Sequence, residues 1–280
     1  MPTTQLKLQL ASAIILTCTV AKFSALGSTL ANSVSVPTQA QTPAARSLAA
    51  PKNEPTNPLP SIEQILARYI EALGGKDAIT RLTSRVARGK VDMPGVSRGG
   101  TFEVYAKAPN KSVSTLDVYP VGVIKQGFNG REGWDQTKET GLQDAVGEDL
   151  AALERDSDFY SPLRLKVKYP KMTLGGKMNI GYREAYVIKA HPTIGEVEKL
   201  YFEKESGLLI RWDVVRATVE GKALAVVYLD DWRKIDGVRL PFLISQSFPG
   251  FTFVLKFEDV KHNLPVDDAL FNKPPRTNEK

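Results

Sequence analysis

Adjacent aspartates in the C-terminal half are the first residues whose spacing could do chemistry. Asp230 and Asp231 lie in the segment YLDDWRKIDGVRLPFLISQS (228–247), and two carboxylates that share a proton or a metal are a known acid–base device. However, Asp236-Gly237 separates two runs of β-forming residues, which predicts a type I′ turn between antiparallel strands. Consecutive strand residues face opposite sides of a sheet. The sequence therefore favours a hairpin over a catalytic dyad, unless a bulge re-aims one carboxylate.

Other reactive residue types are scarce. Cys18 is the single cysteine, and His191 and His262 are the two histidines, so thiol catalysis and Cys- or His-based metal sites are disfavoured. No nucleophile elbow, phosphate-binding loop, zinc-binding His pair or haem motif is present, and we interpret the glycines of TLGGKMNIG (173–181) as a turn. We expect no catalytic residues, no metal and no cofactor, and we assign neither histidine a role.

The first sixty residues are typical of an export leader followed by a tether. Lys7 precedes the apolar stretch LQLASAIILTCTVA and small-residue cleavage options at Gly27, Ala31 or Ala40, so we interpret residues 1–40 as a signal peptide with an unassigned cleavage site. Residues 41–60 are rich in Pro and Ala and predict a disordered tether. The protein is expected to be periplasmic or secreted. Lipidation at Cys18 is a disfavoured alternative, because Thr17 precedes it.

The charge balance gives no sign of a nucleic-acid partner. The chain has 280 residues with 37 Lys and Arg against 31 Asp and Glu, a formal charge of +6, and part of this excess lies in the leader and tether. No basic run carries interleaved aromatic residues. A solvated surface of mixed charge is expected.

Helix signals are few and open the folded part of the chain. Ser61 and Gln64 form a capping box, and apolar residues at steps of three and four predict a helix over residues 62–73 that Gly74-Gly75 ends. The segment KDAITRL (76–82) predicts a short second helix, and residues 144–156 predict a third. An amphipathic helix this near the chain start needs an apolar surface to cover.

From about residue 85 to 262 the sequence consists of repeated strand signals joined by short turns. The clearest segments are TFEVYAK, KSVSTLDV, VGVIKQGFN, REAYVIKA, VEKLYFEK, GLLIRWDVV, ALAVVYLDDWRK, LPFLISQS and FTFVLKFEDV. EKESGLL, KIDGVRL and FNGREGW predict hairpin turns. Successive strands with short connections indicate an antiparallel meander rather than βαβ units.

Large apolar side chains crowd certain strand faces. By strict alternation, Ile210 should share a face with Trp212 and Val214, and Phe253 with Leu255 and Phe257. So few helices cannot cover so large a sheet, so either the sheet curls on itself or an apolar face stays open. The alternatives are a fully packed core and a cavity for an apolar ligand. The predicted ligand-binding residues are Phe102, Val104, Leu200, Phe202, Ile210, Trp212, Phe253, Leu255 and Phe257.

Two C-terminal segments resemble a known family. YLDDWRKIDGVRLPFLI and FEDVKHNLPVDDALFNKP, together with ALGGKDAI and FNGREGWDQ, are similar to the outer-membrane lipoprotein-sorting, or LolA-like, group of periplasmic proteins. The likeness covers most of residues 61–275, which we treat as one domain. It implies a mainly β (α+β) fold, an unclosed antiparallel β-barrel or strongly curved sheet with a helical lid over a hydrophobic cavity.

The resemblance implies a non-enzymatic periplasmic carrier or binder of lipid or lipoprotein acyl chains, with peripheral contact to a membrane. An alternative is an envelope sensor that uses the same half-barrel to bind a partner protein. A third hypothesis is a hydrolase acting through scattered carboxylates such as Asp230, Asp259 and Asp267. In the tail NLPVDDALFNKPP, we expect Leu270 and Phe271 to dock into an apolar groove behind a single helical turn capped by Asp267-Asp268.

Overall fold

The domain is built on one antiparallel sheet of thirteen strands. The computed structural model describes residues 58–95, 98–218 and 221–275, so the signal peptide expected over residues 1–40 and most of the tether lie outside the described residues. The strands are β1 Ser84–Asp92, β2 Gly100–Lys107, β3 Lys111–Val118, β4 Gly122–Phe128, β5 Gly133–Thr137, β6 Gly141–Asp144, β7 Lys171–Ile180, β8 Arg183–His191, β9 Glu198–Glu203, β10 Leu209–Thr218, β11 Gly221–Ile235, β12 Val238–Phe248 and β13 Phe251–His262.

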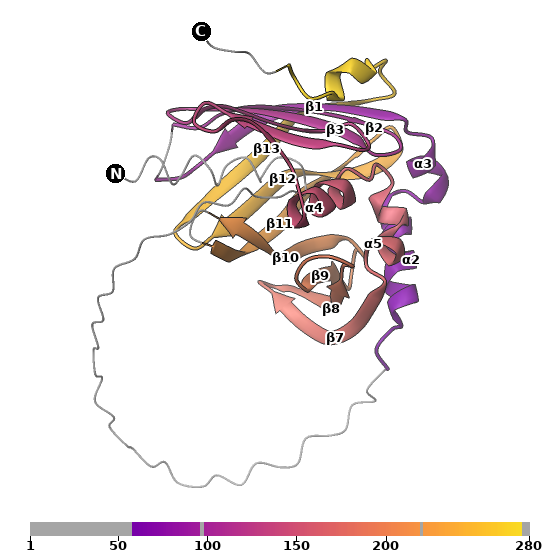
Figure 1. The fold of residues 1–280 in the computed structure, drawn as a ribbon. Coiled ribbons are helices and arrows are strands. Elements are labelled where there is room, and N and C mark those ends of the chain that lie inside the picture. Colours follow the sequence, from indigo (N-terminus) through magenta and orange to yellow (C-terminus); the bar gives the residue numbers. More distant parts are fainter. Residues whose placement is uncertain (1–57, 96–97, 219–220, 276–280) are drawn as a thin grey trace, which may run out of the picture.

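Two meanders meet where the first strand pairs with the last. The spatial order is β6-β5-β4-β3-β2-β1-β13-β12-β11-β10-β9-β8-β7, so β1 lies beside β13, and β6 and β7 are the two edges. The sheet is therefore unclosed. Figure 1 shows it curling strongly, with β7 to β10 turned under the layer formed by β1 to β3. This confirms the predicted curved antiparallel sheet.

Short helices cover one side of the curve. They are α2 Ile62–Leu73, α3 Lys76–Thr80, α4 Glu148–Asp156, the 3-10 turn η2 Ser161–Leu163 and α5 Leu165–Lys168. The predicted capping box is present, because Ser61 Oγ accepts from Gln64 N at 3.2 Å and Gln64 Oε1 accepts from Ser61 N at 2.8 Å. Figure 1 places α2, α3 and α5 along one flank of the sheet. Together, α2, α3, α4, η2 and α5 form the expected lid.

One prediction about a helix and one about a turn need correction. The predicted third helix begins at Glu148 rather than residue 144, because residues 141–144 pair with β5 as the edge strand β6. The η2 and α5 turns were not anticipated. The segment TLGGKMNIG belongs to strand β7 rather than to a turn, and its two glycines lie where the ladder with β8 shifts register between Leu174 and Lys177.

The Asp236-Gly237 turn forms as predicted. Ile235 pairs with Val238 across it, and Asp236 and Gly237 have φ angles of 50° and 90°. Both central residues are thus left-handed, as a type I′ turn requires. The turns expected at FNGREGW and EKESGLL also join paired strands, β4 to β5 and β9 to β10.

The two faces of the sheet carry separate cores, and Ile210 is not where alternation placed it. The main core fills the concave side and includes Trp212 and Val214. Ile210 packs instead with Val187 and Tyr201 in a small cluster elsewhere. The β9–β10 ladder shifts register between Leu209 and Arg211, and this extra residue moves Ile210 to the opposite face.

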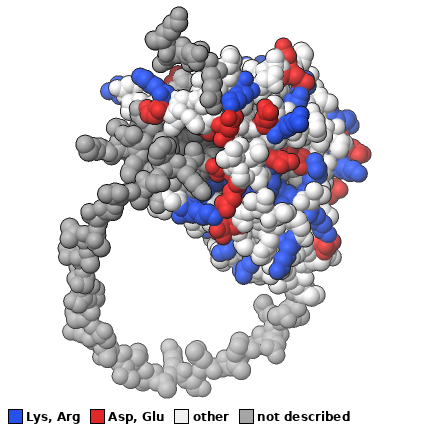
Figure 2. All heavy atoms as spheres, in the orientation of Figure 1, with Lys and Arg blue, Asp and Glu red and all other residues white. Residues whose placement is uncertain are grey.

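The visible surface carries mixed charge. Figure 2 shows Lys and Arg side chains interspersed with Asp and Glu over the face in view, which agrees with the solvated surface expected from composition. Among the described residues, no helix is both long enough and apolar enough to cross a membrane.

The C-terminal segment closes a second core on the outer face of the sheet. The 3-10 turn η3, Asp268–Phe271, is capped by Asp267, whose side chain accepts from Ala269 N at 2.9 Å. Phe271 is fully buried against Val86, Val113 and Trp134. Figure 1 shows this turn lying over β1 to β3, on the side away from the lid. The predicted docking of Phe271 is confirmed.

The predicted burial of Leu270 is wrong, since 42% of its surface is exposed. In a 3-10 turn anchored by Phe271, the preceding side chain points to solvent. Asp268 also differs from the prediction. It does not cap the turn but pairs with Lys107 and Lys111 at 2.8 Å each, and these two hydrogen bonds lower the pKa of its carboxyl to about 2.

Replacing Phe271 with Ala should destabilise the domain. The ring is completely buried, and deleting such a ring typically costs about 3–5 kcal/mol. Chemical denaturation of Phe271→Ala would measure this loss. Leu270→Ala is the matched control, because its exposed side chain should cost no more than about 0.5 kcal/mol. Equal stability of the two variants would show that the tail is loosely attached.

Candidate functional site

Two adjoining cavities lie between the concave face of the sheet and the lid. The larger has a volume of about 190 Å³ and the smaller about 150 Å³. Their linings are mainly apolar or aromatic. They share a wall made of Arg85, Asp156, Asp158, Phe159, Leu240 and Pro241. Each cavity alone falls below the roughly 300 Å³ of common ligand sites, whereas the pair together reaches that size.

The lid supplies much of the lining of the larger cavity. Tyr69 and Leu73 come from α2, Leu165 from α5, and Phe159 from the loop after α4. Two hydrogen bonds hold this loop against the β2–β3 connection and the segment before β1: Phe159 N donates to Pro109 O at 2.9 Å, and Tyr160 Oη donates to Leu82 O at 3.0 Å. The loop is therefore held in place at both residues.

The Asp230-Asp231 pair shapes this cavity instead of doing chemistry. Asp231 has a φ of 50°, and the β11–β12 ladder records partners for Asp230 and Trp232 on either side of it. Leu229 and Trp232 both line the larger cavity, although residues three apart in a regular strand face opposite sides. The left-handed residue therefore turns Trp232 into the cavity.

The two carboxylates of the pair engage different arginines. Asp230 lies 3.6 Å from Arg183, and Asp231 lies 2.6 Å from Arg233. The hydrogen bond from Arg233 lowers the pKa of Asp231. Each carboxylate thus has its own cation, and the two share neither a proton nor a ligand.

The scattered carboxylates of the hydrolase hypothesis do not form one site. Asp230 faces Arg183, Asp259 pairs with Lys261 at 3.2 Å, and Asp267 caps η3. Within the described ranges, no group of three or more His, Cys, Asp or Glu side chains could hold a metal ion. The cavities are accordingly the strongest candidate site.

The nine predicted ligand-binding residues divide into three groups. Leu200 and Trp212 line the larger cavity, and Val104 and Phe257 line the smaller one. Ile210 lies in the separate cluster described above. The remaining four are packed in the main core, less than 4% exposed, and line neither cavity: Phe102, Phe202, Phe253 and Leu255.

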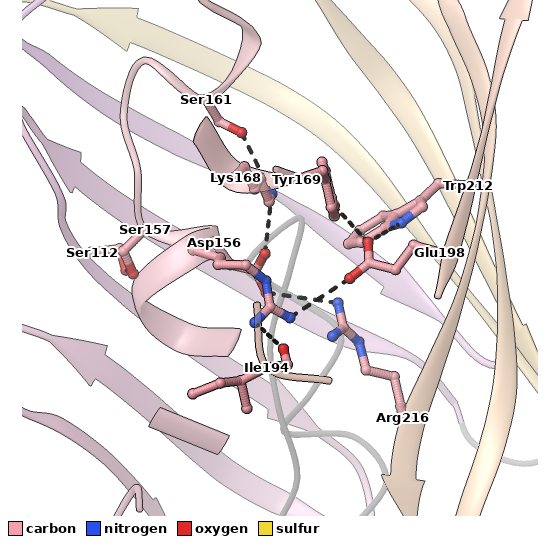
Figure 3. Close-up of polar contacts among 11 residues, drawn as sticks. Ser112, Asp156, Ser157, Ser161, Lys168, Tyr169, Ile194, Glu198, Trp212 and Arg216 are labelled. Carbon is pink, nitrogen blue, oxygen red and sulfur yellow. Dashed lines mark hydrogen bonds and ion pairs between the residues drawn. The ribbon is translucent and has the colours of Figure 1, made fainter. Parts of the chain in front are cut away.

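A cluster of buried charges fastens the lid to the sheet beside the larger cavity (Figure 3). Asp156, at the end of α4, lies 3.3 Å from Lys168 of α5 and 3.7 Å from Arg216 of β10. All three side chains are at most 7% exposed. The cluster thus ties two lid helices to one strand.

Glu198 of β9 is the second acid of this cluster. Its carboxylate accepts from Trp212 Nε1 at 2.7 Å and Tyr169 Oη at 2.5 Å, and lies 3.6 Å from Arg155 of α4. Burial and the Glu198 charge raise the pKa of Tyr169, so its hydroxyl remains protonated and donates. Losing one member of such a buried pair typically costs about 3–5 kcal/mol.

Arg85 differs from the other charged residues of the cavity walls because it contacts a histidine and an aromatic ring. It lines both cavities. Its Nε donates to His262 Nε2 at 3.3 Å, and its guanidinium carbon lies 5.5 Å from the centre of the Phe159 ring. Because arginine can only donate, His262 Nε2 must accept, and Nδ1 therefore carries the proton directed at Asp236 Oδ2, 3.0 Å away.

Several residues that build the site carry no signal in the sequence. Arg85, Phe159, Trp232 and Leu240 had no motif to mark them, and His262 was given no role. Phe159 lies on a loop and Trp232 beside a backbone irregularity, so neither follows from strand periodicity. A single Arg at the start of a strand is also an ordinary surface residue in sequence terms. The acidic pair before Trp232 was the one local signal, and it was interpreted as a feature of the hairpin.

Comparison with solved structures supports the architecture. No protein-family model matches the sequence, and no curated protein matches it significantly. Among solved structures, the fold is similar to a domain named for outer membrane lipoprotein sorting from Vibrio parahaemolyticus (TM-score 0.54, 11% identity, 75% of this chain and 97% of that one).

Two further structures show the same likeness. A LolA superfamily protein from Nitrosomonas europaea has a TM-score of 0.51 at 15% identity, covering 77% of this chain and 99% of its own. A DUF1329 family protein from Desulfovibrio piger has a TM-score of 0.51 at 14% identity, covering 75% and 97%. Likeness at such identities is a likeness of fold. The chain therefore has the LolA-like fold, an unclosed antiparallel half-barrel with a helical lid, as its C-terminal motifs predicted.

Proposed function

We propose that the protein binds the aliphatic chains of lipids or lipoproteins in the paired cavities and acts as a non-enzymatic carrier or binder. The observation that supports this most is the pair of adjoining, mainly apolar cavities beneath a lid on the concave face of the sheet. A binding site for an aliphatic chain, which carries no polar groups, needs apolar surface and few polar side chains. The absence of a catalytic or cofactor motif is compatible with that need.

The energetics of such a site are favourable. Each buried methylene contributes about 0.8 kcal/mol, so about ten methylenes supply roughly 8 kcal/mol before the cost of association is subtracted. Leu200, Leu209, Leu229 and Leu240 present aliphatic surface to the larger cavity. The lid is where a chain would enter, because α2 and the loop after α4 separate the cavity from solvent.

The comparisons support a role in the cell envelope. One similar structure is named for outer membrane lipoprotein sorting and another for the LolA superfamily, and the leader-like N-terminus fits export. We propose a periplasmic or secreted location on these grounds. The alternative of an envelope sensor would use the same half-barrel to hold a partner protein.

Paired substitutions distinguish a cavity wall from packed core. Leu240 is half-buried and lines both cavities, whereas Leu255 is 1% exposed and lines neither. Leu240→Gln should weaken binding of a fluorescent fatty acid about tenfold and cost little stability, because its amide can face the cavity. Leu255→Gln buries an unpartnered amide and should cost about 3 kcal/mol or more.

Titration with the fatty acid and thermal unfolding measure the two effects. Organic extraction of the purified protein followed by mass spectrometry adds an independent check, since a carrier should release a co-purified lipid. Failure of the wild type to bind any aliphatic probe would overturn the proposal. Equal loss of stability in both variants would show that Leu240 is core as well, and capture of an envelope protein without lipid would favour the sensor.

Export makes a separate prediction. Mature protein recovered from the periplasm or medium should lack Met1 and begin between about residues 28 and 41, as signal-peptide cleavage requires. N-terminal mass spectrometry checks this. An intact Met1 on the soluble protein would contradict the proposed location.

A further inference from the structure

We propose that Arg85 is an anion anchor in the shared wall of the two cavities, so that the preferred ligand is an aliphatic chain carrying an oxyanion headgroup such as a carboxylate or a phosphate. This inference rests on the proposed function and names the headgroup of its ligand. It follows from the position of one cation for which the described part of the chain provides no acidic partner.

The acids near Arg85 already have partners. Asp156 is held by Lys168 and Arg216 at 3.3 and 3.7 Å. Asp158 lies 3.4 Å from Arg164 and also accepts from Tyr160 N at 3.1 Å. Among the described residues, no ion pair joins Arg85 to any carboxylate. Its recorded contacts are the His262 ring, which is neutral as an acceptor, and the face of Phe159.

An arginine in this position has unused binding capacity. Nε contacts His262, whereas Nη1 and Nη2 have no recorded partner in the described structure, and the residue keeps partial exposure although it lies inside the domain. Burial lowers the pKa of Arg85 to about 10, so the side chain remains a cation at neutral pH. A partly buried cation without an anion is unfavourable, and a planar guanidinium suits the bidentate geometry of an oxyanion.

The orientation of Arg85 is fixed by a chain of cross-strand contacts. Arg85 and His262 are direct partners in the β1–β13 ladder, and the side chain of His262 is fully buried. Asp236, in the β11–β12 turn, lies 3.0 Å from His262 Nδ1. This arrangement holds Nε in place in a residue that lines both cavities.

Parinaric acid and its methyl ester provide a test, because the two share one fluorescent chain and differ in headgroup charge. At about pH 8, where the acid is ionised, the wild type should bind the acid at least about tenfold more tightly than the ester, as expected for a charge-assisted hydrogen bond. Competition by dodecyl phosphate and dodecanoate then distinguishes a phosphate from a carboxylate headgroup.

Arg85→Met should abolish this preference, so that the acid and the ester bind with equal affinity. Its melting temperature should fall only modestly, because the buried acceptor of His262 loses its donor but no acid is left alone. Arg85→Gln is a second variant that keeps a donor for His262 and should behave in the same way. Arg239→Met is the matched control: Arg239 also lines the larger cavity but is exposed and donates to Ala72 O at 3.1 Å, so the preference should persist.

The outcomes distinguish a failure of the proposed lipid-binding function from a failure of the anion anchor. If the wild type binds neither probe, the proposed function fails. If it binds acid and ester equally, or if both Arg85 variants keep the preference, the anion anchor is overturned while the lipid-binding role stands. A large fall in melting temperature in both Arg85 variants would likewise overturn it, because it would show that Arg85 is a structural residue.

Discussion

The ladder between β1 and β13 is the interaction on which the rest of the domain depends. It joins a six-stranded meander to a seven-stranded one, and the contacting residues are separated by most of the chain. Without it there would be two smaller sheets, each with an uncovered apolar face. With it, strand twist accumulates over thirteen strands and bends the sheet into an open half-barrel. The concave interior is a consequence of that pairing.

A curved sheet of this size cannot be filled by its few helices, and the lid divides the interior unevenly. At one end Phe253 and Leu255 pack into a dense core. At the other, the loop after α4 bridges the curve and leaves the two cavities. Buried ion pairs then fasten α4 and α5 to β9 and β10. Such pairs add little net stability over apolar packing but penalise any arrangement that separates the partners, which suits a lid that must close in one position.

Local sequence signals were sufficient to predict helix starts and turns, but not to predict which side chains face the interior. The capping box at Ser61 and the Asp236-Gly237 turn are specified by neighbouring residues, so both were predicted correctly. The side on which Ile210 lies depends on a register shift against β9, and the orientation of Trp232 depends on one left-handed residue. Strict alternation cannot anticipate either. Leu255 and Leu240 look equally apolar in sequence, and only the path of the lid decides which one packs and which one faces a cavity.

The same ladder explains why Arg85 lies in the shared wall of the two cavities. Arg85 stands at the start of β1, opposite His262 at the end of β13, so closing the sheet brings the two side chains together. His262 is in turn oriented by Asp236 from the tight turn, whose geometry fixes where that carboxylate can reach. The turn, the closing ladder and the cavity wall are therefore one connected structure. A substitution in the turn that displaced Asp236 would act on the cavity wall indirectly, because Asp236 orients His262 and His262 in turn holds Arg85.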